Sequence, residues 1–205
     1  MKLKFLVLII AALVLGSCLA KEDDSTSASF LVINSLTGKD LEGNEGSTTV
    51  FSDVSLAGSI VNDNGVASVI ALTYNPTEDS DEHDITYYMN VVVDQIDVEF
   101  MRPDGRNVEG VDVPYRFSQP MTMIVPIDEE VEIPFILIRH VAKLEMPLLG
   151  LREVPNREID LQLVAKVTLH GKDLGGHRVA PVSQNVDVWC CNYADEEPEP
   201  VPPTT

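Results

Sequence analysis

Two histidines and an aspartate near the end of the chain have the side chains that a transition metal prefers. His170, Asp173 and His177 lie in one short stretch. Two imidazoles and a carboxylate with an open fourth position would suit a catalytic zinc, so a metal-dependent hydrolase is one functional hypothesis. Against it, His170 should share a strand face with Thr168 and Lys166, and the glycines that follow His170 do not fix a ligand geometry.

An acidic stretch, TEDSDEHD at residues 77–84, is a second candidate site. Asp79, Asp81, Glu82 and Asp84 could offer oxygen ligands to calcium, a hard cation that takes six to eight oxygens. This pattern supports a calcium-stabilised adhesion or carbohydrate-binding module as another hypothesis. The stretch lacks the glycine and the distal glutamate of an EF-hand loop, and the alternative is a solvated acidic loop.

The adjacent cysteines Cys190 and Cys191 do not predict a disulfide, because neighbouring side chains on a strand point to opposite faces. One of the pair could be a small buried apolar residue, or an exposed thiol could bond a partner in an oxidising compartment. There is no Gly-x-Ser-x-Gly motif and no glycine-rich phosphate loop. We therefore expect no catalytic residue of the nucleophile type, no bound cofactor other than calcium under the second hypothesis, and no enzymatic activity.

The first residues, MKLKFLVLIIAALVLGSC, have the layout of a secretory signal peptide. Lys2 and Lys4 precede an apolar run from Phe5 to Leu15. This run is well short of the roughly twenty residues that a transmembrane helix needs. It predicts export without a permanent membrane span.

The stretch Leu15-Gly16-Ser17-Cys18 resembles the lipobox of bacterial lipoproteins, which has an aliphatic residue and two small residues before a cysteine. The resemblance implies cleavage between Ser17 and Cys18 and acylation of Cys18, and two or three acyl chains anchor a protein stably. In such lipoproteins an aspartate after the cysteine favours the inner membrane. Leu19 stands here, so the resemblance implies the outer membrane. The alternative is an ordinary cleaved signal.

The charge balance excludes one class of partner. The chain has a formal net charge of −19, and loss of the two lysines of residues 1–17 takes it to −21. Such a body should be repelled by nucleic acid and by anionic lipid. We expect no nucleic-acid partner.

The elements that must position these side chains are short strands separated by Gly, Pro, Asn and Asp. Ile159 to Leu169 alternates strictly between apolar and polar residues, and the segment from Arg178 to Tyr193 should pair with it as a hairpin. The sequence Asn62-Asp63-Asn64-Gly65 predicts a turn, and Pro147 limits residues 140–151 to a turn or two of helix. The strand candidates are 30–36, 48–56, 66–74, 87–101, 111–117, 121–127, 131–138, 159–169 and 178–193.

Eight or nine strands with one short helical turn predict an all-β protein, a single antiparallel β-sandwich. The pattern resembles an immunoglobulin-like fold in the broad sense, although it lacks the Cys…Trp…Cys arrangement of antibody domains. We expect a signal peptide at 1–17, a tether at 18–28, the sandwich at 29–193 and an acidic, proline-rich disordered tail at 194–205.

Together these features favour a lipid-anchored, non-enzymatic protein of the bacterial cell envelope that contacts an unidentified envelope protein. An edge strand could serve for β-augmentation. Tyr87, Tyr88 and Tyr115 could form a recognition patch, or they could pack half-buried on the strands.

Overall fold

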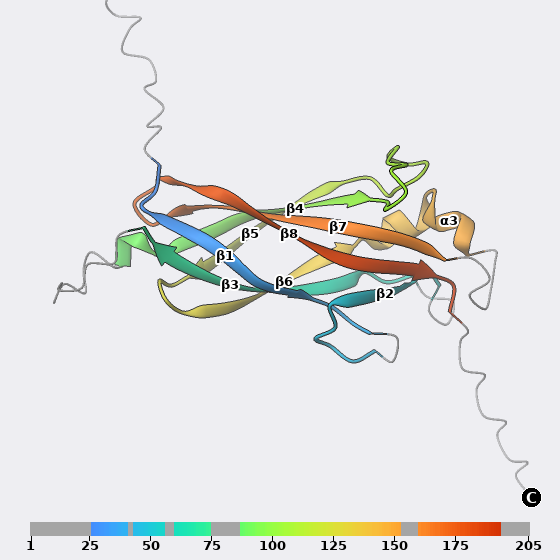
Figure 1. Ribbon diagram of the computed structural model, residues 1–205, viewed down its shortest axis with the longest axis horizontal. Coiled ribbons are helices and arrows are strands. Elements are labelled where there is room, and N and C mark those ends of the chain that lie inside the picture. Colours follow the sequence, from blue (N-terminus) through green and yellow to red (C-terminus); the bar gives the residue numbers. More distant parts are fainter. Residues whose placement is uncertain (1–25, 41–42, 56–59, 75–86, 153–159, 194–205) are drawn as a thin grey trace, which may run out of the picture.

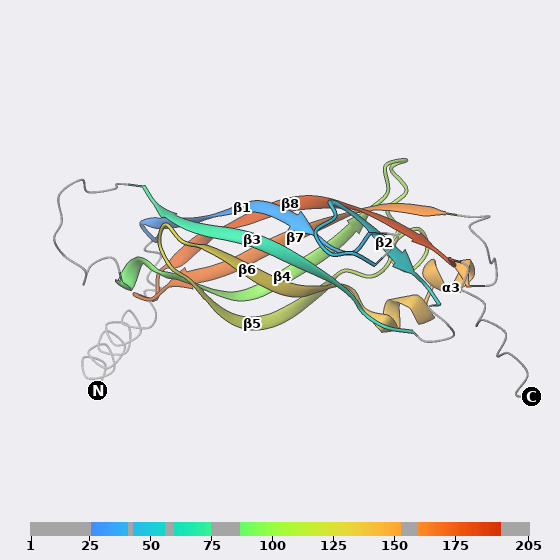
Figure 2. The ribbon, with the colours of Figure 1, turned by 90° about the horizontal axis from the view of Figure 1, so that it is seen from below.

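The fold is known from a computed structural model, which describes residues 26–40, 43–55, 60–74, 87–152 and 160–193. Within these ranges eight strands form two sheets that lie face to face (Figure 1 and Figure 2). The smaller sheet has the order β1-β3-β6 and is antiparallel. Its strands are β1 (Ser29–Thr37), β3 (Asp63–Thr73) and β6 (Glu130–Ile138).

The larger sheet has the order β2-β8-β7-β4-β5. Its strands are β2 (Thr49–Asp53), β8 (Arg178–Cys191), β7 (Leu161–Asp173), β4 (Val91–Met101) and β5 (Phe117–Val125). The predicted hairpin is present as β7 and β8, which pair antiparallel. Strand β2 lies parallel to β8, whereas the other strand pairs of the described residues are antiparallel.

The core lies between the sheets, and strand alternation builds it. On β4, Ile96 and Val98 are fully buried while Asp97 between them lies on the outer face. The inward residues of β7 follow the same rule from Leu161 to Leu169. The predicted all-β sandwich is therefore confirmed, and period-two patterning is its local cause.

Two predicted elements are wrong. Residues 62–65 do not form a turn, because β3 already begins at Asp63. Gly65 is needed there for close packing, since a Cβ on it would lie 2.7 Å from Cζ of Phe135. Residues 111–116 do not form a strand either, because residues 110–112 form a turn between the isolated bridge partners Glu109 and Val113, with a φ of 74° at Gly110.

The segment 140–151 is helical, as predicted, in two short pieces. These are the 3-10 helix η1 (His140–Leu144) and the α-helix α3 (Leu148–Leu151). They follow β6 and cover one end of the sandwich (Figure 1).

The molecule has two distinct ends. At the proximal end the chain enters the sandwich, where Thr26 bridges to Arg178 at the start of β8 and Ser29 Oγ donates to the carbonyl of Met89 at 2.7 Å. The distal end holds α3, the segment 102–116 and the last residue of β8 (Figure 1). Because β7 and β8 run the full length, the two ends are about 40 Å apart at 3.3 Å per strand residue.

One side chain links the two sheets along the edge formed by β5 and β6. Gln119 of β5 donates from Nε2 to the carbonyl of Ile136 on β6 at 2.9 Å. Its Oε1 accepts from the N–H of Ile136 at 3.0 Å. A single amide thus joins the edge strands of the two sheets in the way a neighbouring strand would.

Candidate functional site

His170 lies on the outer face of the larger sheet and pairs with Asp97 across β4 and β7. The distance from His170 Nε2 to Asp97 Oδ2 is 2.8 Å, and Gln95 Nε2 donates to Asp97 Oδ1 at 2.7 Å. Burial alone would raise the pKa of Asp97, but hydrogen bonds from Ser118, Gln95 and His170 outweigh it and hold that pKa below its usual value. The carboxylate is therefore ionised at neutral pH and orients the imidazole.

Ser118, Asp97 and His170 include the residue types of a nucleophilic triad, but their order is wrong for that chemistry. In a serine hydrolase the histidine lies between the serine and the carboxylate and takes the hydroxyl proton. Here the aspartate lies between the other two. The arrangement ties three strands together.

Asp173 and His177 form a second, separate pair at the proximal end. Asp173 is buried, its Oδ1 accepts from the N–H of His177 at 2.9 Å, and its Oδ2 lies 3.2 Å from His177 Nδ1. Burial would raise the pKa of Asp173, but hydrogen bonds from His177 and Ser27 outweigh it and hold the pKa low. This pair fixes the turn between β7 and β8.

The predicted group of His170, Asp173 and His177 is therefore only partly assembled. The structure brings Asp173 to His177 and gives His170 another carboxylate, Asp97. Among the described residues no set of three or more His, Cys, Asp or Glu side chains could hold a metal ion. The hydrolase hypothesis receives no support from this geometry.

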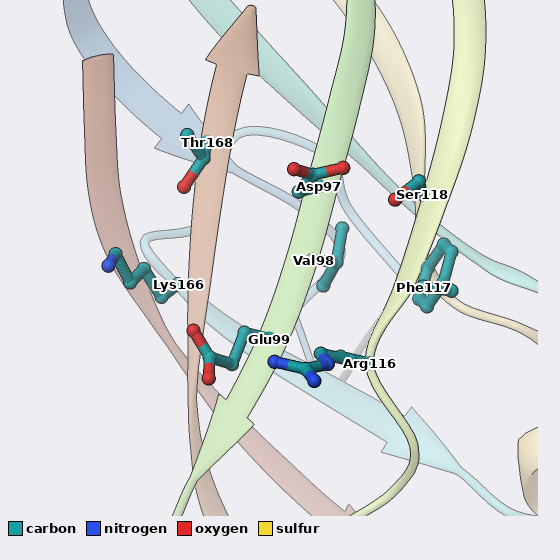
Figure 3. Close-up of a pocket in the computed structure, with 8 residues that line it drawn as sticks. All are labelled: Asp97, Val98, Glu99, Arg116, Phe117, Ser118, Lys166 and Thr168. Atoms are coloured by element: carbon teal, nitrogen blue, oxygen red, sulfur yellow. The ribbon is translucent and has the colours of Figure 1, made fainter. Parts of the chain in front are cut away.

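A groove of about 570 Å³ crosses the outer face of β7, β4 and β5 (Figure 3). It carries both charges, and Glu99 lies directly opposite Lys166 on the neighbouring strand. The groove could make polar contacts to a peptide or a glycan, but its charges largely balance one another. Its lining residues are Asp97, Val98, Glu99, Arg116, Phe117, Ser118, Lys166 and Thr168.

Exposed apolar side chains occur on three segments of the distal end, the residues just before β3, the segment 102–116 and the segment 140–151, and we call this set the distal apolar surface. The segment 140–151 is mostly apolar, and it buries Ala142, Leu148 and Leu151 while other apolar residues face solvent. A short helix cannot turn every side chain inward. The members are Val61, Val108, Val111, Tyr115, Val141, Leu144, Met146 and Leu149.

The tyrosines predicted as a patch are divided between the ends. The rings of Tyr87 and Tyr88 are 5.8 Å apart at the proximal end, near Tyr74, whose ring lies 4.7 Å from that of Phe30. Tyr115 lies at the distal end beside Gly110. A single patch of Tyr87, Tyr88 and Tyr115 does not exist.

A buried polar cluster at the distal end was not predicted. Lys143 is 1% exposed, and its Nζ donates to the backbone carbonyl of Asp53 at 2.7 Å and to Asp63 Oδ1 at 2.9 Å. Ser52 Oγ donates to the other oxygen, Asp63 Oδ2. Burial raises the pKa of Asp63, against the attraction of Lys143. The one signal in the sequence was a lysine within an apolar helical segment.

Both cysteines of β8, Cys190 and Cys191, are buried, so the exposed-thiol interpretation is wrong. Burial raises the pKa of Cys190 to about 12, with the nearby carboxylate of Asp63 adding to the effect. At neutral pH Cys190 is a thiol and packs as a small apolar residue.

The remaining predicted sites lie outside the described residues. These are the lipidation and cleavage residues Ser17 and Cys18 and the calcium candidates Asp79, Asp81, Glu82 and Asp84. In the part of the chain that the structure describes, no helix combines the length and the apolar character needed to cross a bilayer.

Comparison with known proteins does not assign the chain to a family. No protein-family model matches it. A search of curated proteins finds no match either.

Proposed function

We propose that this chain is a lipid-anchored protein of the bacterial cell envelope, held at Cys18 in the outer membrane, that contacts another envelope protein and catalyses no reaction. The lipobox-like Leu15-Gly16-Ser17-Cys18 supports the anchor. The distal apolar surface is the observation that carries the contact.

Two features make the distal apolar surface a contact site. Exposed apolar groups gain free energy when a partner covers them, at about 25 cal/mol per Å², and clusters of them mark interaction surfaces. The surface also lies at the end opposite the chain entry at Thr26, about 40 Å away by strand length. An anchor at Cys18 would leave that end directed away from the lipid.

The partner should be a protein and not a membrane surface. The net charge of −21 that remains after loss of residues 1–17 repels anionic lipid, and the same charge slows approach to an acidic protein. A partner that offers an apolar patch with a basic rim meets both conditions.

The anchor is tested first, by fractionation of cells that express the full chain or Cys18→Ala. We expect the full chain in the membrane fraction and the variant in the soluble fraction. The same distribution for both proteins would refute the anchor.

The contact is tested by photo-crosslinking in living cells, with a crosslinking residue at position 149 or 111 and a matched control at Asn185, which is exposed on β8. We expect one discrete crosslinked species from positions 149 and 111 and none from 185. Leu144→Ser should abolish it. Equal crosslinking from all three positions, or from none, would refute the distal contact site.

A further inference from the structure

We propose that Lys143 and Asp63 condense after folding into an amide that links their side chains covalently. The inference rests on the buried polar cluster and is independent of the proposed function. It assigns to the pair a modification site, formed by the chain itself, with water as the product released.

The geometry places the reacting groups in contact. Lys143 Nζ lies 2.9 Å from Asp63 Oδ1, and the side chains are 1% and 17% exposed. The fold holds both segments, since η1 packs at the distal end where β3 begins. Well-oriented groups within one fold react with effective molarities of up to about 10⁵ to 10⁸ M, and Nζ reaches that orientation when it moves from Oδ1 to Cγ.

The hydrogen-bond partners fit the amide better than the ion pair. An ammonium has three N–H donors, whereas the described residues give Lys143 Nζ two acceptors, the carbonyl of Asp53 and Asp63 Oδ1. An amide has one N–H and one carbonyl oxygen. Asp53 would keep the N–H, and Ser52 would keep donating to the oxygen that was Asp63 Oδ2.

Burial also favours the neutral product. Two buried charges carry a desolvation penalty that their mutual attraction does not always repay, and a neutral amide with both partners satisfied avoids it. Burial raises the pKa of Asp63 and so favours its protonated form. The OH group of that acid can leave as water once it takes up one more proton. Its neighbours Ser52 and Cys190 are fully buried, so the site is shielded from water on that side, while 17% of the Asp63 side chain is exposed.

The step balances without an oxidant or a further reactant. The ammonium proton moves to the carboxylate, and the free amine of Lys143 attacks Cγ of Asp63. Ser52 donates to the oxygen that becomes negative, the role of an oxyanion donor. The bond from Cγ to Oδ1 breaks, and Oδ1 leaves as water with a second proton from the nitrogen.

Peptide mapping of the full-length protein tests the proposal directly. Trypsin should release residues 40–106 joined to residues 140–152, one water lighter than the sum, with no cleavage after Lys143. In Lys143→Arg, which keeps the charge but not the amine, and in Asp63→Ala, the linked species should be absent. If either variant does not fold, the wild-type map alone decides.

Two results would overturn the proposal. The first is a folded wild-type protein whose map contains free 140–143 and 144–152 with unmodified 40–106 and no linked species. The second is a linked species that persists in Asp63→Ala, which would assign the amide to another carboxyl group.

Discussion

Gln119 offers a direct test of how the two sheets are held together at their edge. Its side-chain amide makes two hydrogen bonds to the backbone of Ile136, at 2.9 and 3.0 Å. Gln119→Met removes both bonds and keeps an unbranched side chain of similar length. The variant therefore isolates the amide group from the packing of its stem.

The expected loss follows from the bond count. A neutral hydrogen bond contributes about 0.5 to 1.5 kcal/mol to stability, so Gln119→Met should cost about 1 to 3 kcal/mol. For a chain of this size 1 kcal/mol moves the Tm by about 2 to 4 °C. We expect a decrease of about 2 to 12 °C.

Gln119→Glu gives the sharper comparison. At neutral pH the carboxylate still accepts from the N–H of Ile136, but an oxygen now faces the carbonyl of Ile136 where the NH₂ group donated. Two acceptors in contact repel. The glutamate variant should therefore be at least as unstable as the methionine variant, although its shape is almost unchanged.

Urea and thermal unfolding followed by circular dichroism measure these changes, with Thr122→Ala as the control. Thr122 is exposed on the same strand, and surface substitutions usually change stability by less than about 0.5 kcal/mol. If Gln119→Met stays within that limit, or if Gln119→Glu is as stable as the wild type, the amide does not join the sheets energetically.

Three further predictions concern β7 and β8. Gly171→Ala should lower stability by about 1 to 3 kcal/mol in urea unfolding, because the new Cβ would lie 2.5 Å from the carbonyl oxygen of Val92; an unchanged midpoint would contradict this packing. The pKa of Asp173 is lowered in the folded state. The ionised carboxylate therefore stabilises the fold above the unfolded pKa of about 3.9, and this contribution is lost as the pH falls through the folded pKa. The difference in Tm between the wild type and Asp173→Asn should accordingly shrink when the pH is lowered from 7. A difference that does not change with pH would refute a lowered pKa of Asp173. In Cys18→Ala, both thiols of β8 should resist a disulfide reagent at about pH 8 and react on unfolding, because the Cys190 pKa is raised to about 12; rapid labelling of the folded protein would show that the site is open.

The sequence predicts the sandwich well wherever alternation is local. Residues 161–169 and the hairpin partner that begins at Arg178 could be placed because every second side chain is apolar and a glycine-rich turn follows. The helical segment at 140–151 could be predicted from a local signal as well, because Pro147 divides it into two short pieces. Such patterns depend on neighbours along the chain.

Features that depend on distant segments could not be predicted in this way. The parallel pairing of β2 with β8 joins residues more than a hundred positions apart. The stretch 62–65 has the composition of a turn, yet Phe135 from another strand packs on Gly65 and keeps it in β3. Tertiary contact overrides local preference at these points.

The candidate sites also differ in whether their partners are close or distant in the sequence. His177 could be connected to Asp173, four residues away, because one turn holds both. The partner of His170 is Asp97, and the partner of Lys143 is Asp63, each on a strand remote in sequence. A list of nearby ligand types cannot identify such pairs.

The course of β8 determines how the molecule would carry a mechanical load. Thr26 bridges to Arg178 at one end of this strand, and Cys191 lies at the other end. A pull between the chain before Thr26 and the chain after Cys191 therefore acts along the strands, whereas the hydrogen bonds of antiparallel pairs lie across them. Tension along the strands loads many of these inter-strand hydrogen bonds at the same time, so they must break together and not one after another. The sandwich should therefore resist being pulled apart between its two ends.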